Sequence, residues 1–166
     1  MAKLSLEYLY RLPKIKTEKV PPLLLLIHGY GSNEADLFPF SQNLPDEFLI
    51  ISVRAPLSLG YQSYAWYTIN FNATDGNFSD ISEAITARDK IIYFLEELQN
   101  EFTFNPNNIS LFGFSQGTIL SYAIALSYPD KITNVVALSG YVKKELITEI
   151  KEPLFYTNLD IFISHG

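Results

Sequence analysis

A serine flanked by two glycines is the pattern in this sequence best suited to chemistry. The segment Gly113-Phe114-Ser115-Gln116-Gly117 has the form G-x-S-x-G. In that pattern the serine occupies a sharp turn between a strand and a helix and exposes its hydroxyl. A serine hydroxyl at neutral pH is a weak nucleophile and needs a general base. The chain has two histidines, so the first question is whether either can serve Ser115.

The residues around Ser115 support such a turn. The apolar run NISLFGF at 108–114 predicts a buried strand, and the mostly apolar run TILSYAIALSY at 118–128 predicts a helix. Between them, Gly113 and Gly117 permit a turn too tight for larger side chains. The alternative interpretation is that the glycines form an ordinary strand-to-helix turn and that Ser115 only caps the helix.

A second glycine-containing segment follows an earlier apolar run at 23–27. It consists of His28, Gly29, Tyr30 and Gly31. Ligands of open α/β sheets bind at the carboxyl ends of the strands, so this segment places flexible backbone where a substrate would lie. Backbone amides at such a site stabilise developing negative charge. The best donors are the amide of Tyr30 and the amide of Gln116, which opens the helix after Ser115.

Neither histidine is well placed to be the base. Hydrolases with this serine motif have the chain order serine, acid, histidine. His28 precedes Ser115, and we interpret it as a structural residue that orients its loop. His165 closes an apolar run and is expected at a strand end. For the acid, Asp130 lies in a predicted surface turn, and Asp160 begins the last strand at the end away from the site. His28 or His165 acting as the base remains an alternative.

Strands and helices alternate along the chain. Short apolar runs predict five central strands, at 23–27, 48–53, 108–114, 134–140 and 159–166, and a period of two predicts another from Leu4 to Tyr10. Helices are predicted from Asp80 to about 104, at 118–128 and, interrupted by Pro39, at 34–43. This order predicts an α/β fold with a mostly parallel sheet and helices on both faces. The segment 54–79 is expected to be a long functional loop with little secondary structure.

Composition limits the remaining possibilities. The 166 residues fit one domain, and 48% hydrophobic residues predict a packed core. The net charge of −6 and the lack of clustered lysine and arginine argue against nucleic-acid partners. The absence of cysteine excludes disulfides and thiolate sites. No apolar run is long enough to span a membrane, and the N-terminus lacks the pattern of a signal peptide. We expect a cytoplasmic protein without cofactor or metal, and its oligomeric state is not predicted.

The sequence resembles the phospholipase/carboxylesterase family of α/β-hydrolases, which includes the acyl-protein thioesterases. Four segments support the resemblance, in family order: LLIHGYGSNEADLF (25–38), ISVRAPLSLGYQSYAWY (51–67), LFGFSQGTILSYAIALSYPDKI (111–132) and ALSGY (137–141). The resemblance implies Ser115 as the nucleophile, with Tyr30 and Gln116 as oxyanion donors. It also implies that Trp66 lines the substrate pocket; the alternative is that Trp66 is a core aromatic residue.

The resemblance has one departure. In this family the acid follows a late strand that ends in His-Gly, and the catalytic histidine comes after one more strand. The segment DIFISHG at 160–166 matches that late strand. We therefore expect the acid and base beyond residue 166. The domain at 1–166 would then lack its last strand and helix and expose a sheet edge, and this chain alone would have little activity.

The leading functional prediction is a serine hydrolase that cleaves carboxylic esters or thioesters. The aromatic and apolar residues of 54–79 favour an acyl or aryl group over a charged one. A peptidase or a lactone hydrolase is an alternative within enzymes. A non-catalytic or degenerate hydrolase-like binding module is the alternative from another class.

Overall fold

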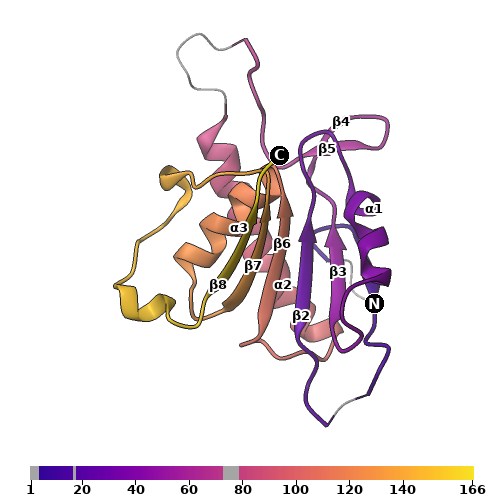
Figure 1. Ribbon diagram of the computed structural model, residues 1–166. Helices are drawn as coiled ribbons and strands as arrows, with labels where there is room; N and C mark the ends of the chain where they lie inside the picture. Colours follow the sequence, from indigo (N-terminus) through magenta and orange to yellow (C-terminus); the bar gives the residue numbers. More distant parts are fainter. Residues whose placement is uncertain (1–3, 17, 73–78) are drawn as a thin grey trace.

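A mostly parallel sheet forms the centre of the computed structural model, which describes residues 4–16, 18–72 and 79–166 (Figure 1). Its strands are β1 (Tyr8–Arg11), β2 (Leu23–Ile27), β3 (Leu49–Val53), β6 (Ile109–Phe114), β7 (Ile132–Leu138) and β8 (Asp160–Ser164). The spatial order is β1-β3-β2-β6-β7-β8. Only β1 is antiparallel to its neighbour, β3. The parallel sheet and its five predicted central strands are confirmed.

Helices cover both faces of the sheet, as predicted. They are α1 (Glu34–Leu37), α2 (Ile81–Glu101) and α3 (Gln116–Ser127), with 3-10 turns η1 (Phe38–Gln42), η2 (Lys144–Leu146) and η3 (Pro153–Tyr156). Alternate residues of β2 divide between the faces. Leu23, Leu25 and Ile27 pack with α2 and α3, whereas Leu24 and Leu26 pack with the α1 side. Burial on both faces explains why this strand is apolar throughout.

Two side-chain hydrogen bonds fix the start of α2. The Asp80 side chain accepts a hydrogen bond from the Glu83 amide at 2.9 Å, as predicted. The Glu83 carboxylate accepts a hydrogen bond from the Thr68 amide at 2.6 Å. Glu83 therefore ties the helix to the segment that precedes it instead of closing a reciprocal capping box.

The prediction that 54–79 is a loop with little secondary structure is wrong in its first half. Residues Leu57–Gly60 (β4) and Ser63–Ala65 (β5) form a small antiparallel hairpin. Tyr64 of β5 also bridges to Ser32, in the loop after β2. This pairing joins residues about thirty positions apart, which explains why the local pattern did not reveal it. Residues 73–78 lie outside the described part of the chain.

Several predicted boundaries also shift. The helix expected at 34–43 is one turn of α1 followed by η1, because Pro39 near the start of η1 has no amide to continue an α-helix. Helix α3 begins two residues earlier than expected, directly after Ser115. The first strand is confined to Tyr8–Arg11.

Strand β8 is a sheet edge with exposed apolar residues. All five of its residues are exposed, including Ile161, Phe162 and Ile163, and within the described residues it pairs only with β7. This agrees with the exposed edge expected from the sequence. Such an edge offers unpaired backbone groups to another strand.

The core on the α2 side yields a stability prediction. Phe94 of α2 is fully buried, and its ring lies 5.6 Å from that of Tyr8 in β1. Phe94→Ala should lower the free energy of unfolding by about 3–5 kcal/mol because it leaves a cavity. Tyr93→Ala, at an exposed neighbouring position, should change it by no more than about 0.5 kcal/mol. Urea denaturation measures both; similar losses would contradict this description of the core.

Candidate active site

Ser115 lies at the sharp turn between β6 and α3. Its backbone has φ 52° and ψ −113°, in a region that residues with a side chain rarely adopt. The Ser115 amide donates a hydrogen bond to the Leu138 carbonyl at the end of β7, at 3.0 Å. The turn is therefore held by the neighbouring strand. Its position, directly after a central strand and before a buried helix, is the one predicted from the sequence.

The two glycines of the motif are required by close packing. A Cβ on Gly117 would lie 1.9 Å from the Ile27 carbonyl oxygen at the end of β2. A Cβ on Gly113 would lie 2.6 Å from the backbone of Gly117. Neither contact is possible for a real side chain. The glycines thus let the first turn of α3 rest directly on β6 and β2.

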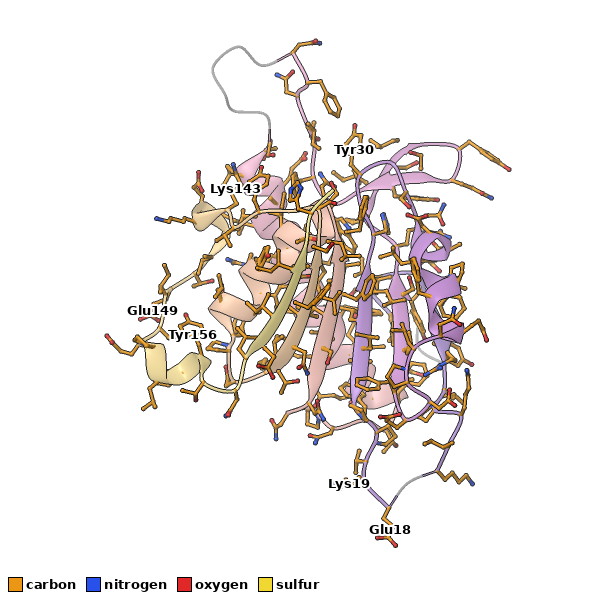
Figure 2. The ribbon with its side chains drawn as sticks, in the orientation of Figure 1. Glu18, Lys19, Tyr30, Lys143, Glu149 and Tyr156 are labelled. Carbon is orange, nitrogen blue, oxygen red and sulfur yellow. The ribbon has the colours of Figure 1, made fainter. Side chains whose placement is uncertain are left out.

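The loop after β2 approaches Ser115 through Gly29. A Cβ on Gly29 would lie 3.3 Å from the Cβ of Ser115 and 3.0 Å from the Phe114 ring. The next residue, Tyr30, lies at the carboxyl edge of the sheet (Figure 2). Gly31 adopts φ +78°, which glycine tolerates. The structure thus places the loop with the predicted oxyanion donor Tyr30 beside the predicted nucleophile.

The hairpin holds this loop from the other side. The Gly31 amide donates to the Tyr64 carbonyl, and the Tyr64 amide donates to the Ser32 carbonyl, both at 2.8 Å. Arg54 pairs with Glu34 at the start of α1, and its guanidinium lies 4.8 Å from the centre of the Tyr64 ring. Hydrogen bonding to Arg54 lowers the pKa of Glu34. These contacts fix the loop between α1 and β5.

Gln116 has separate roles for its backbone and side chain. As the first residue of α3, it has no intrahelical acceptor for its amide, which lies at the positive end of the helix dipole. Its side chain is 1% exposed and bonds backward, accepting from the Trp66 amide at 3.0 Å and donating to the Tyr67 carbonyl at 2.7 Å. The sequence did not indicate this second role.

His28 is a buried structural residue. Its Nε2 accepts a hydrogen bond from the Ala55 amide at 3.0 Å, so the ring proton is on Nδ1, which donates to the Gly29 carbonyl at 2.7 Å. Burial lowers the pKa of His28. With both ring nitrogens occupied, His28 has no free nitrogen for Ser115. The structure therefore favours the interpretation of His28 as the residue that orients its loop.

Trp66 occupies the core, as in the alternative interpretation, and its predicted role in lining the substrate pocket stays a prediction. Trp66 is 1% exposed and belongs to the main core cluster. Its indole N–H donates to the His28 carbonyl at 2.9 Å, and the two rings lie 5.6 Å apart. Trp66 therefore packs in the core against the loop of residues 28–31.

No complete acid and base pair accompanies Ser115 among the described residues. Asp130 lies just before β7, and Asp160 is the first residue of β8. Both are therefore at the amino ends of the parallel strands, whereas Ser115 follows the carboxyl end of β6. His165 follows β8 at the same edge as Ser115, but β7 lies between β6 and β8. With strands spaced by about 4.8 Å, His165 is displaced from Ser115 by about 10 Å across the sheet.

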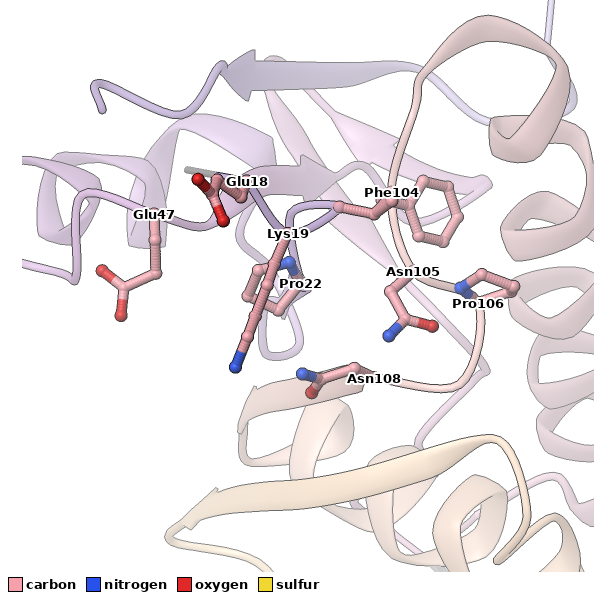
Figure 3. Close-up of a pocket in the computed structure, with 9 residues that line it drawn as sticks. Glu18, Lys19, Pro22, Glu47, Phe104, Asn105, Pro106 and Asn108 are labelled. Atoms are coloured by element: carbon pink, nitrogen blue, oxygen red, sulfur yellow. The ribbon is translucent and has the colours of Figure 1, made fainter. Parts of the chain in front are cut away.

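A cleft of about 550 Å³ lies next to Phe114, the residue before Ser115. It is lined by the loop after β2, the start of α1 and Phe114. A larger cavity, about 810 Å³, lies near Pro22, Phe104 and Asn108 (Figure 3). Glu18 and Lys19, which also line it, lie at the opposite end of the molecule from Tyr30 (Figure 2). The smaller cleft is thus the one lined by the loop that approaches the predicted nucleophile.

The described residues contain neither a metal-binding cluster nor a membrane-spanning helix. In residues 4–16, 18–72 and 79–166, no three histidine or acidic side chains are grouped so that they could hold a metal ion. None of the described helices has the length and apolarity to cross a membrane.

Some contributors to the site had no signal in the sequence. Ala55, Tyr67 and Phe114 contact the site through backbone groups or packing, which leave no pattern of residue types. Ser139, at the end of β7, also has a positive φ of 51°. The segment ALSGY, which contains Ser139, supported the family resemblance, but the sequence predicted no role for this serine.

Comparison with solved structures defines the fold class. The Bacillus cereus carboxylesterase superposes with a TM-score of 0.73 at 19% identity, over 97% of this chain and 84% of that chain. Maize acyl-protein thioesterase 2 gives a TM-score of 0.68 at 18% identity, over 96% and 75%. The sheet order, the helices on both faces and these neighbours show that the chain has the α/β-hydrolase fold.

The chain belongs to the phospholipase/carboxylesterase family, which it matches over residues 14–166. Acyl-protein thioesterase 1 of Kluyveromyces lactis is 29% identical over 163 residues, covering 91% of this chain and 70% of that protein. An uncharacterized hydrolase of Mycosarcoma maydis is 22% identical over 151 residues, covering 81% of this chain. The chain spans only 55% of the length of this second relative. The family and relatives indicate a hydrolase of the esterase or thioesterase type.

The buried His28 predicts a pH dependence of stability. An unfolded histidine takes up a proton below a pKa of about 6.5, whereas burial lowers the pKa of folded His28. Stability from the neutral ring is therefore present above about pH 6.5 and is lost as the pH falls below it. His28→Gln should be less stable than wild type at pH 8, by an amount that shrinks towards pH 5.

Urea denaturation between pH 5 and pH 8 measures this effect. Phe94→Ala serves as the control, since its deficit should stay constant with pH. A His28→Gln deficit that also stays constant would show that His28 is not held neutral.

Proposed function

We propose that this protein is a serine hydrolase that cleaves carboxylic esters or thioesters through an acyl-enzyme at Ser115. The main support is the left-handed backbone of Ser115, at a sharp turn directly against Gly29 of the loop after β2. Strain of this kind persists only where the surrounding structure imposes it, and it is concentrated at functional sites. Membership of the phospholipase/carboxylesterase family supports the ester or thioester class.

The proposed reaction has two stages. Ser115 Oγ attacks the carbonyl carbon while its proton passes to a general base, and the C–O or C–S bond then breaks as the leaving group takes that proton. Water hydrolyses the acyl-enzyme in the second stage. The amides of Tyr30 and Gln116 donate to the oxyanion in both stages. The Gln116 amide suits this role because it has no acceptor within α3.

We propose that the acid and base come from chain beyond residue 166. Two observations support this: both nitrogens of His28 are occupied, and His165 lies two strands from Ser115. The carboxyl end of β8 reaches the same sheet edge as Ser115, so a segment continuing from it would approach the nucleophile. Residues 1–166 alone are expected to have little activity, because the loss of one triad member leaves only about 10³–10⁴-fold acceleration over water.

The cleft formed by Phe114 and the loop after β2 suits a substrate with an apolar part. Phe114, which is 41% exposed, and Tyr30 line it, together with polar residues of the loop and α1. Such a mixed surface accepts an acyl or aryl group with a polar bond near the serine. A peptide or lactone carbonyl would use Ser115 in the same way, so substrate profiling separates these classes.

A non-catalytic binding module is the second candidate function. The observation in its favour is the absence, among the described residues, of an acid and base pair next to Ser115. Such a module would bind an ester-like ligand in the cleft formed by Phe114 and the loop after β2, without covalent reaction. Reaction with a fluorophosphonate probe separates the two candidates.

A fluorophosphonate probe tests the nucleophile. The protein expressed from the complete coding sequence should be labelled on Ser115 and should hydrolyse short p-nitrophenyl esters, and Ser115→Ala should abolish both. Ser139→Ala is the matched control, because Ser139 also has a positive φ and follows the neighbouring strand; its labelling should persist. Mass spectrometry locates the label.

Two outcomes would contradict the proposal. Absence of labelling, or labelling unchanged in Ser115→Ala, would exclude the acyl-enzyme and favour the binding module. Residues 1–166 alone should react at least about 10³-fold more slowly. Equal rates for the two forms would instead assign the base to His165 or His28.

A further inference from the structure

A buried hydrogen-bond network lies directly behind the proposed oxyanion donors. Its centre is the side-chain amide of Gln116, whose oxygen accepts from the Trp66 amide at 3.0 Å and whose nitrogen donates to the Tyr67 carbonyl at 2.7 Å. Gln116, Trp66 and Tyr67 are each 1% exposed. The Gln116 side chain thus holds two backbone groups of a distant segment, the Trp66 amide and the Tyr67 carbonyl.

The network continues into the loop after β2. The Trp66 indole N–H donates to the His28 carbonyl at 2.9 Å. His28 in turn donates from Nδ1 to the Gly29 carbonyl and accepts at Nε2 from the Ala55 amide. The Gly29 carbonyl belongs to the same peptide group as the Tyr30 amide, and the His28 carbonyl belongs to the peptide group before it. Their orientation therefore constrains that of the Tyr30 amide.

These contacts connect the two proposed donors through the protein interior. One donor is the amide of Gln116 itself, and the other is the amide of Tyr30, reached through Trp66 and His28. Every link lies away from water, where a polar group that loses its partner is costly. Movement of the Trp66 segment would therefore displace the loop relative to α3.

We propose that the side-chain amide of Gln116 is a positioning group that sets the distance between the two oxyanion donors. This inference rests on the oxyanion hole proposed above. Glutamine suits the role because its side chain accepts one hydrogen bond and donates another in the same plane. Methionine has a similar length but supplies neither of these hydrogen bonds. Ionised glutamate accepts but cannot donate, so it would face the Tyr67 carbonyl unfavourably.

Gln116→Met tests the proposal without removing the backbone amide. The rate of phosphonylation at Ser115 by the fluorophosphonate should fall about 10- to 100-fold at saturating probe, since small displacements of catalytic groups have effects of this size. The probe concentration for half-maximal rate should change less than threefold. Ser121→Ala is the matched control: it removes another buried hydrogen bond of α3, from Ser121 Oγ to the Gly117 carbonyl, and should keep the wild-type rate per folded molecule.

Gln116→Glu adds a readout that loss of stability alone would not produce. A buried glutamic acid has a raised pKa, and its protonated form can both accept and donate, as glutamine does. The labelling rate of Gln116→Glu relative to wild type should therefore rise as the pH falls from 9 to 6. A ratio that stays constant over this range would overturn the positioning role.

A spectroscopic measurement separates this inference from the proposed function. The Trp66 indole N–H resonance, identified by its loss in Trp66→Phe, should shift in Gln116→Met because the hydrogen bond to His28 changes. If wild type is labelled and Gln116→Met is labelled equally fast, the inference is wrong and the proposed function stands. If wild type is not labelled, the oxyanion hole and the inference that rests on it both fail, and an unchanged indole resonance would remove the structural link as well.

Discussion

The arrangement of the site depends on one close approach, that of Gly117 to the carbonyl at the end of β2. The space for a Cβ at Gly117 is already occupied by the Ile27 carbonyl oxygen. Because α3 rests on β2 at this point, the turn that holds Ser115 lies against the loop that begins with His28. A larger residue at 117 would separate the proposed nucleophile, Ser115, from the loop after β2.

The sheet topology makes that approach possible. β2 and β6 are adjacent and parallel, and Ile27 pairs with Gly113. The segments that follow these two strands therefore leave the sheet side by side, at its carboxyl end. The chain after β2 turns into the loop and α1, whereas the chain after β6 turns into α3. Ligands of parallel α/β sheets bind where such connections diverge. The pairing of β2 with β6 thus brings together the two segments that form the site.

The sequence predicted what depends on local residue types. Continuous apolar runs predict strands of a parallel sheet, and for this reason β2, β3, β6, β7 and β8 were found, although only β2 and β3 are buried at every residue. The turn at Ser115 was found because its close packing demands glycines at fixed positions. The sequence also excluded cysteine chemistry outright.

Contacts between distant segments were not predictable in this way. Gln116 bonds to residues about fifty positions earlier, and the indole of Trp66 bonds to a carbonyl 38 positions earlier. A tryptophan can serve equally in a core or in a pocket wall, so its type alone did not place Trp66. The β4–β5 hairpin was missed because its pairing with the loop after β2 is also long-range.

We propose that Ser115 and two backbone amides form one reaction centre. A crystal structure of the protein after reaction with a phosphonate probe tests it most directly, because the phosphonyl oxygen occupies the position of the oxyanion. We expect a covalent bond from phosphorus to Ser115 Oγ, and a phosphonyl oxygen about 2.7–3.1 Å from the amide nitrogens of both Tyr30 and Gln116. A phosphonyl oxygen that points to solvent, or an adduct on another residue, would contradict it.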